Sequence, residues 1–299
     1  MESVPKYFAA ENFHGADDDL TAEAKFFREN GYLIVDLLTD LPADWFQSLR
    51  DEIDQLLAGA HRLGDGWKAG PMIRELAVNP LMQDKLTALF GRRAFPFQTL
   101  NFRFGSQQKP HADHIHFSSL PAHFMCGVWV ALEDVDIASG PLIYYPGSHK
   151  LPLLDLSDAG VAGNREIGTG EYGHHYEPLI QRTLLERGIE PVSFEAKRGQ
   201  AIIWAANLIH GGAKQQDETR TRYSQVTHYY FDDCAYYTPM KSDLASDRIH
   251  FRRPHDISRD GARVTPVRPG KPCAVGPKAW IEDWLKDTFF RRRVARFDG

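Results

Sequence analysis

Three residues from two separate segments have the types and spacing of a metal site. His111 and Asp113 are two positions apart in a stretch that we expect to be a strand, and His210 opens the sequence His-Gly-Gly far downstream. In an extended strand, residues i and i+2 point to the same side, so His111 and Asp113 can bind one ion together. Two imidazoles and one carboxylate on one face of an iron(II) ion leave positions for a co-substrate and O2. The pattern predicts the iron centre of an oxygenase, with His210 as the third ligand.

A rival ligand pair lies beside it. His114 and His116 form a His-x-His sequence, which opens the metal site of cupins. A cupin site needs a glutamate a few residues later, and the following residues 117–120 (FSSL) supply none. We therefore expect His116 to lie beside the metal or to face the substrate, and a cupin-like metal site without 2-oxoglutarate stays the less favoured alternative.

Composition and charge exclude several classes of protein. The 299 residues are 42% hydrophobic and 25% charged, as in a soluble globular protein with a sizeable core, and the net charge is −5. This balance argues against a nucleic-acid-binding protein, which would carry a basic stripe. The basic cluster at 291–293 and 296 is interpreted as the solvated end of a C-terminal helix.

Cysteines and the N-terminus bear on the compartment. Cys126, Cys234 and Cys273 lack the close spacing of a disulfide framework or of a zinc knuckle. The first residues lack the basic and apolar regions of a signal peptide. No apolar run approaches the roughly 20 residues of a membrane helix. We expect a cytoplasmic protein without membrane contact.

The N-terminal third is predicted to be helical with one early strand. A short helix should begin after Thr21 and end at Asn30-Gly31, and a strand should follow at 32–38. Asn79-Pro80 starts a further helix that Gly91 ends. Between them, apolar residues with helical spacing mark an amphipathic helix: Trp45, Leu49, Ile53, Leu56 and Leu57.

From residue 94 the pattern changes to short strands separated by Gly and Pro, which favours a closed or double-sheet β architecture. The expected strands are 95–104, 111–117, 127–132, 142–145, 192–194, 201–204 and 222–231. The segment 155–187 interrupts them, and it is too long for a hairpin loop. Such insertions are often lids or binding loops.

An ordered series of motifs surrounds the proposed ligands. Its members are KPHAD at 109–113, GVWVALED at 127–134, GPL at 140–142, YPGSH at 145–149, KRGQAIIW at 197–204 and HGG at 210–212. Arg222, six residues before His228, belongs to the same series. Over roughly residues 29–230 this series resembles the phytanoyl-CoA dioxygenase-like family of iron(II)/2-oxoglutarate oxygenases.

The resemblance implies a fold and a domain plan. The family's fold is a double-stranded β-helix, a jelly-roll barrel with the metal in its mouth. We expect a mainly β protein with α-helices, formed by a single domain over 1–299. The helical layer would cover about 1–93, the jelly-roll core about 94–232, the insertion or lid about 155–187, and a C-terminal extension about 233–299.

The resemblance also implies roles for site residues. His111, Asp113 and His210 would bind Fe(II), and Arg222 would pair with the distal carboxylate of 2-oxoglutarate, as a guanidinium fork suits a carboxylate. Arg220 competes for this role, and the motif favours Arg222. The resemblance also implies that Trp129 would line the co-substrate pocket and that Gln98 would be a further contact.

The implied reaction consumes O2 and 2-oxoglutarate, yields succinate and CO2, and oxidises a C–H bond of a small organic molecule. Because halogenases on this scaffold replace the carboxylate ligand with a small residue, Asp113 makes hydroxylation the default. Desaturation, epoxidation and ring formation stay open, as does a non-catalytic member of the fold. No clustered basic residues suggest a coenzyme A handle. The insertion 155–187 is the expected specificity element, and the oligomeric state is left open.

Other residues near these motifs have plainer interpretations. His149 is expected to hold a turn, and Trp204 to belong to the core. His174 and His175 lie in the insertion and are expected to be solvated. Tyr144 and Tyr145 alternate along a strand, so one of them should point towards the substrate.

Overall fold

The N-terminal helices begin and end where the capping residues predict. The computed structural model describes residues 21–164, 166–268 and 271–272. Helix α1 (Ala22–Asn30) is capped by the Thr21 hydroxyl, which accepts a hydrogen bond from the Ala24 amide, and ends at Gly31 with φ 78°. Asn79 caps α4 (Pro80–Phe90) in the same way. The other two helices of this layer are α2 (Ala43–Leu57) and α3 (Pro71–Ala77).

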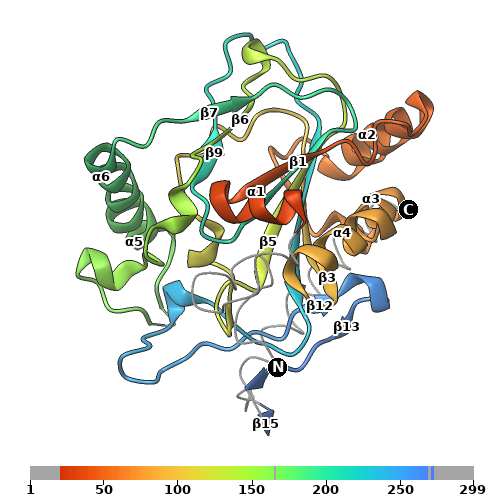
Figure 1. Ribbon diagram of the computed structural model, residues 1–299. Coiled ribbons are helices and arrows are strands. Elements are labelled where there is room, and N and C mark those ends of the chain that lie inside the picture. The colour runs from red at the N-terminus through yellow and green to blue at the C-terminus, as the bar shows by residue number, and fades with distance from the viewer. Residues whose placement is uncertain (1–20, 165, 269–270, 273–299) are drawn as a thin grey trace.

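Two antiparallel sheets form the centre of the molecule (Figure 1). The larger has the order β1-β8-β5-β10-β3-β2 and the smaller the order β7-β6-β9. The strands of the larger sheet are β1 (Tyr32–Val35), β2 (Leu63–Gly64), β3 (Ala94–Phe102), β5 (Met125–Ala131), β8 (Ala201–Ala205) and β10 (Ser224–Phe231). Those of the smaller are β6 (Leu142–Tyr144), β7 (Val192–Phe194) and β9 (His210–Gly212). The prediction of a mainly β protein with a double sheet and helices is confirmed.

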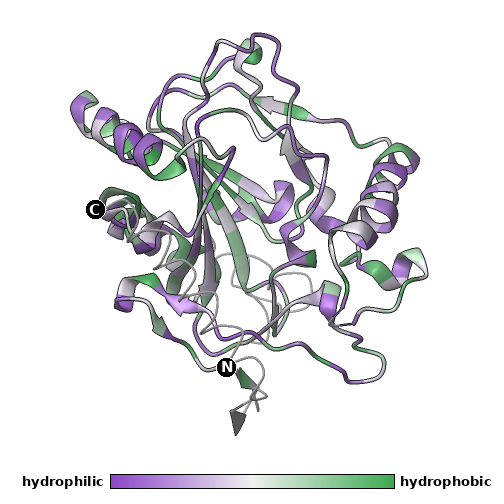
Figure 2. Ribbon diagram, turned by 180° about the vertical axis from the view of Figure 1, so that it is seen from behind, coloured by the Kyte–Doolittle hydropathy of each residue, from purple (hydrophilic) through white to green (hydrophobic). Residues whose placement is uncertain are grey.

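Side chains of the larger sheet alternate between two cores. From β5, Val128 and Val130 pack with the helices, whereas Trp129 and Ala131 face the interior between the sheets. Leu142 of the smaller sheet belongs to the same interior cluster as Trp129. Figure 2 shows the apolar colour along these central strands. One face of the larger sheet is thus covered by helices, and the other lines the space between the sheets.

The predicted strand at 111–117 is wrong. Only His111 makes a β-bridge, to His210, and η3 (Asp113–Ile115) is a 3-10 helix. The amides of His116 and Phe117 both donate to the Asp113 carbonyl at 2.9 Å, which closes a tight turn where a strand would stay extended. The first strand is also shorter than predicted, since β1 ends at Val35.

The insertion folds into short helices beside the smaller sheet. Its elements are η6 (Leu156–Ala159), α5 (Thr169–Glu171), the π-helix η7 (Tyr172–Tyr176) and α6 (Glu177–Arg187). Their apolar residues form a third core with Ala112, Ile115 and Ile209. The insertion therefore packs directly against the segments that carry the predicted ligands.

The segment after β10 returns along the larger sheet's lower end (Figure 1). β11 (Ala235–Tyr237) pairs with β4 (Ser118–Leu120), close to η3 in sequence. The later elements are η8 (Pro239–Lys241), β12 (His255–Asp256), η9 (Ile257–Arg259), β13 (Ala262–Arg263), β14 (Val267–Arg268) and β15 (Lys271–Pro272). The short 3-10 helices elsewhere are η2 (Gly66–Lys68), η4 (Ile137–Ser139) and η5 (Ser148–Lys150).

Some sequence predictions concern other properties of the chain. Cys126 and Cys234 are buried free thiols, while Cys273 and the basic cluster at 291–293 and 296 lie outside the described residues. In the part of the chain that the structure describes, none of the helices has the length and apolar character needed to cross a bilayer.

Candidate metal centre and co-substrate pocket

The three predicted ligands come together. His111 and His210 exchange backbone hydrogen bonds of 2.9 Å in both directions, which fixes them side by side. Asp113, at the start of η3, places its Oδ1 3.8 Å from the Nε2 atom of each histidine. One ligand atom from each of the three lies within 4.8 Å of the others, and all three residues are buried. The arrangement presents two nitrogens and one oxygen to a common point.

The glycines after His210 allow this close approach. A Cβ on Gly211 would lie 2.7 Å from the carbonyl oxygen of Gln108, and one on Gly212 would lie 2.8 Å from the amide nitrogen of Gln107. Any side chain at either position would push the segment before His111 away from β9. The His-Gly-Gly sequence thus supplies a ligand and the space for its partner.

Each histidine ligand is held with its Nε2 lone pair free. The Nδ1 atom of His111 lies 2.9 Å from the Lys109 carbonyl, and that of His210 lies 3.0 Å from the Leu208 carbonyl. Because a carbonyl oxygen only accepts, each Nδ1 carries the proton and donates it. Burial, with the neighbouring His210, lowers the pKa of His111 to about 3, so this ring is neutral at ordinary pH. Neutral imidazoles fixed in this tautomer are the form that binds metals.

The second carboxylate oxygen of Asp113 is also bound. Oδ2 accepts a 2.7 Å hydrogen bond from the Trp204 indole, and His228 Nε2 lies 3.3 Å away. Burial alone would raise the pKa of Asp113, but the electrostatic effects of His210 and His228 outweigh it and hold the pKa below its ordinary value. Asp113 is therefore an oriented carboxylate that offers Oδ1 to a metal. The donor set of two imidazoles and one carboxylate fits Fe(II) with positions left for other ligands.

Sequence reasoning missed the roles of Trp204 and His228. Trp204 belongs to the interior core, as predicted, and its ring also lies 4.5 Å from that of His210. A Cβ at Gly127, the residue opposite it on β5, would lie 2.4 Å from the indole, so the glycine makes room for it. The signal available in the sequence was the alternation of β8, which points Ile202 and Trp204 to the interior.

Arg222 is a buried cation. Arg222, just before β10, is 2% exposed and donates from Nη1 to the Gly140 carbonyl at 3.2 Å. Its Nε has no hydrogen-bond partner, and no carboxylate pairs with it in the part of the chain that the structure describes. Burial lowers the pKa of Arg222 to about 10. Since an uncompensated buried charge is costly, this guanidinium fits an anionic ligand.

Other polar atoms without partners line the same region. The guanidinium carbon of Arg222 lies 5.7 Å from the centre of the Trp129 ring. The indole nitrogen of Trp129 and the hydroxyl of Ser224 are both buried without hydrogen-bond partners. Together with Arg222 they form a group of unpaired polar atoms, called the polar pocket below, that suits a small carboxylate-bearing molecule.

Two further residues, Arg220 and Gln98, were considered for binding 2-oxoglutarate. Arg220 is half-exposed and pairs with Asp136 at 2.7 Å, so its charge already has a partner. Gln98 is half-buried, and its amide oxygen lies 3.0 Å from Nδ1 of His228. Gln98 thus contacts a residue that holds Asp113, and its contact with 2-oxoglutarate stays a prediction.

The remaining histidines lie outside the ligand cluster. Among the described residues, neither His114 nor His116 belongs to the group that could hold a metal. His114 contacts Ser118 at 3.3 Å, and the ring of His116 lies 5.1 Å from that of Tyr172. His149 donates to the Arg28 carbonyl at 2.8 Å, which agrees with its predicted structural role.

The structure also shows where the two adjacent tyrosines and the histidines of the insertion lie. Tyr144 joins the interior cluster that contains Trp129, whereas Tyr145 packs under the insertion. His174 and His175 of η7 are exposed, as predicted.

The hydrogen bond from Trp204 gives a first testable prediction. Replacing Trp204 with phenylalanine should weaken the affinity of the site for divalent metal by about 10- to 100-fold, since partners of ligating carboxylates contribute that much. Trp129→Phe is the matched control, because its indole nitrogen has no partner, and its metal affinity should match wild type. Competition titration against a chromophoric chelator measures both. Equal affinities for the two variants would contradict the role of Trp204.

Acid should destabilise the metal-free protein. Burial lowers the pKa values of His111, His114 and His116 to about 3, 4 and 4, from 6.5 in the unfolded chain. Between pH 6.5 and 4 the unfolded chain therefore binds protons that the folded protein does not, and stability falls as the pH falls. Each histidine contributes up to about 1.4 kcal/mol per pH unit. Chemical denaturation across this range measures the slope, and a free energy of unfolding independent of pH would contradict the prediction. His114→Phe should make the slope shallower.

Solved structures of other proteins superpose on this one. The non-heme alpha ketoglutarate dependent epimerase SnoN from nogalamycin biosynthesis superposes with a TM-score of 0.57 at 22% identity, over 85% of this chain and 94% of that one. EctD from S. alaskensis superposes with a TM-score of 0.56 at 20% identity, over 75% and 81% of the two chains. These superpositions show the fold, which is a mainly β, cupin-like jelly-roll with helices. Because the sequence identities are low, they show the fold alone.

Sequence comparison establishes the family. A probable phytanoyl-CoA dioxygenase of Caenorhabditis elegans is 29% identical over 183 residues, which are 56% of this chain and 54% of that protein. Phytanoyl-CoA dioxygenase domain-containing protein 1 of Mus musculus is 22% identical over 162 residues, 53% and 52% of the two chains. The chain thus spans about half the length of these curated relatives. The sequence profile of the phytanoyl-CoA dioxygenase (PhyH) family matches residues 61–221, and the chain belongs to that family.

Proposed function

We propose that this protein is an iron(II)- and 2-oxoglutarate-dependent oxygenase that oxidises a C–H bond of a small organic molecule, with hydroxylation as its default reaction. The observation that carries the proposal is the buried cluster of His111, Asp113 and His210, together with the buried guanidinium of Arg222, whose Nε has no hydrogen-bond partner among the described residues. Two imidazoles and a carboxylate are the ligand set of this enzyme class. Membership of the PhyH family supports the same assignment.

Each residue of the site then has a definite task. Nε2 of His111, Nε2 of His210 and Oδ1 of Asp113 would hold the iron. The guanidinium of Arg222 would bind the distal carboxylate of 2-oxoglutarate, which supplies the partner that Nε lacks. Bound iron(II), O2 and 2-oxoglutarate together supply the oxidising chemistry and release succinate and CO2. The indole of Trp204 keeps the carboxylate of Asp113 turned towards the metal.

Similar structures support the cofactor assignment and widen the range of outcomes. SnoN has been solved in complex with Fe3+, alpha ketoglutarate and nogalamycin RO, and EctD with 2-oxoglutarate and 5-hydroxyectoine. The related SnoK is a carbocyclase. Because one scaffold serves several reactions, the product of this enzyme has to be identified directly.

The insertion 155–187 is proposed to select the substrate. The ring of Tyr172, from η7, lies 5.1 Å from that of His116, which follows Asp113 by one turn. Ala112 lies between the ligands His111 and Asp113 in the sequence and packs in one core with the insertion. Removing the whole insertion would therefore also expose Ala112. A single side-chain change is therefore the sharper test of substrate selection than deletion.

Tyr172→Ala should change substrate use and spare the metal centre. We expect KM for the substrate to rise about tenfold or more, since burial of an aromatic ring contributes a few kcal/mol. Succinate formation without substrate should stay close to wild type. His175→Ala, an exposed residue of the same π-helix, is the control. Loss of the substrate-free reaction in Tyr172→Ala would count against a role confined to the substrate.

The function itself is tested by product analysis. Purified protein with Fe(II), 2-oxoglutarate and O2 should form succinate, and a library of small organic molecules should contain compounds that accelerate this and gain one oxygen atom by mass spectrometry. Iron and 2-oxoglutarate binding without any succinate would favour the non-catalytic alternative.

A further inference from the structure

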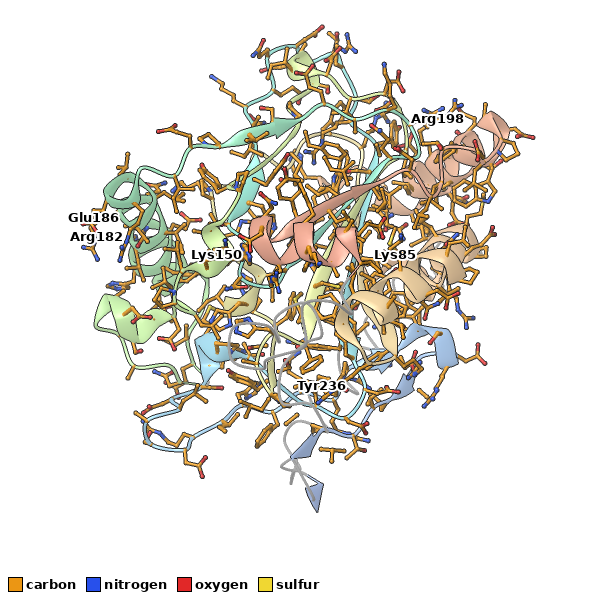
Figure 3. All side chains as sticks on the ribbon, in the orientation of Figure 1. Lys85, Lys150, Arg182, Glu186, Arg198 and Tyr236 are labelled. Atoms are coloured by element: carbon orange, nitrogen blue, oxygen red, sulfur yellow. The ribbon has the colours of Figure 1, made fainter. Side chains whose placement is uncertain are left out.

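A second guanidinium is connected to the candidate centre through side-chain contacts. Arg252, in the segment after β11, has a buried Nε without a hydrogen-bond partner. Its backbone amide donates to the carbonyl of Tyr236, which Figure 3 labels, and Nη1 donates to the Thr238 hydroxyl at 3.2 Å. In the described ranges no carboxylate forms an ion pair with Arg252. Its charge is therefore held in place by neutral groups alone.

Contacts connect this guanidinium to the metal centre. Its carbon lies 4.7 Å from the centre of the Phe117 ring. The same ring lies 5.2 Å from that of His228, whose Nε2 is 3.3 Å from the carboxylate of Asp113. Arg252 is thus separated from a metal ligand by two side chains.

The surroundings of Arg252 are positively charged and aromatic. The pKa of His116 is lowered to about 4, mainly by burial. Asp113 raises this pKa, whereas the nearby Arg252, His228 and Arg62 lower it further. Asp113, the acid in this set, is already bound by its own partners. The guanidinium lies over the ring of Phe117, which contacts the ring of His116, and that ring in turn contacts the ring of Tyr172.

A purely structural role explains these facts poorly. Stacking on Phe117 and one hydrogen bond to Thr238 position the side chain but leave its charge without a counterion. Holding a partly buried cation without a counterion is unfavourable, whereas an arginine that receives an anion from a ligand is common. Arg222 in the polar pocket has the same signature, and there the anion is the proposed co-substrate.

We propose that Arg252 binds an anionic group of the substrate, so that the substrate is an organic anion whose body lies against Phe117, His116 and Tyr172. This rests on the proposed function and adds the chemical class of the substrate. A carboxylate or a phosphate ester would fit a guanidinium equally well. The anion at Arg252 would hold the substrate at one end, with its C–H bond towards the metal.

Binding of simple probes tests the proposal without turnover. Protein loaded with Zn(II) and 2-oxoglutarate is screened by ligand-observed NMR against aromatic carboxylic acids, their primary amides and phenyl phosphates of similar size. Wild type should bind one anionic series about tenfold or more tightly than the amides, as expected for a charged hydrogen-bonded pair. Whether acids or phosphates prevail identifies the anion.

Variants decide whether Arg252 is responsible. Arg252→Gln should remove the preference for anions and leave amide binding unchanged, and Arg252→Lys should retain part of it. Arg182→Gln is the control, because this exposed arginine pairs with Glu186 on the outer side of α6 (Figure 3). Melting temperatures verify that each variant is folded.

Two results would overturn the proposal. One is a wild type without preference for anions, whether it binds both series or neither. The other is an Arg252→Gln variant that keeps the preference. Calorimetry of 2-oxoglutarate on the same Zn(II)-loaded protein separates the causes. If 2-oxoglutarate binds and the preference is absent, only the role of Arg252 fails. If 2-oxoglutarate does not bind to wild type, the proposed function fails and this inference fails with it.

Discussion

Asp113→Ala is expected to abolish iron-dependent succinate formation and to weaken iron affinity by more than about 100-fold. Asp113 is the one charged ligand of the cluster, and its Oδ1 lies 3.8 Å from both Nε2 atoms. Loss of a ligand should exceed the roughly 10- to 100-fold effect of losing a group that merely orients one. Anaerobic iron titration and succinate quantification measure the two effects.

The substitution has a clean control. Asp51→Ala removes an exposed carboxylate of α2 that accepts a hydrogen bond from Gln47, and it should alter neither quantity. If Asp113→Ala bound iron within a few-fold of wild type, the ligands would have to be sought elsewhere, and the pairing of His111 with His210 would need another explanation.

Arg222→Met should separate co-substrate binding from stability. Truncating one partner of a buried charge pair costs about 2–5 kcal/mol, so the affinity for 2-oxoglutarate should fall by roughly 30-fold or more. Among the described residues the guanidinium has no carboxylate partner, and burial lowers its pKa to about 10. An apolar side chain of similar length should therefore leave the melting temperature of the ligand-free protein unchanged or raised. Iron affinity should stay at the wild-type value.

Arg220→Met distinguishes the two arginines. It breaks an exposed ion pair with Asp136, worth about 0–1 kcal/mol, and should leave 2-oxoglutarate affinity intact. Calorimetry of 2-oxoglutarate on Zn(II)-loaded variants gives the affinities, and thermal unfolding gives the stabilities. The reverse pattern, with affinity lost in Arg220→Met and kept in Arg222→Met, would contradict the assignment.

Much of the site was predictable because its ligands occur in short sequence motifs. The His-x-Asp and His-Gly-Gly sequences carry the ligand types and the spacing, and the short strands separated by Gly and Pro from residue 94 onwards predicted the double sheet. Helix caps at Thr21 and Asn79 fixed helix starts directly. These features depend on near neighbours in the chain, and so they can be recognised without knowledge of the tertiary structure.

What the sequence could not predict depends on long-range register. The contact of Trp204 with Asp113 requires β8 to pair with β5 so that the indole lies over Gly127. The place of His228 beside Asp113 likewise follows from the pairing of β10 with β3 and β5. The expected strand at 111–117 failed because its polar alternation also suits the turn that the Asp113 carbonyl closes.

The most direct test of the account is anaerobic titration of the metal-free protein with Fe(II) and then with 2-oxoglutarate. Chelation of the keto acid by iron in this ligand set produces a weak visible charge-transfer band. We expect the band in wild type, no band in Asp113→Ala, and a band in Arg222→Met only at much higher 2-oxoglutarate concentration. Wild-type protein that binds iron but develops no band at saturating 2-oxoglutarate would contradict the central claim that His111, Asp113 and His210 form an iron(II)/2-oxoglutarate centre.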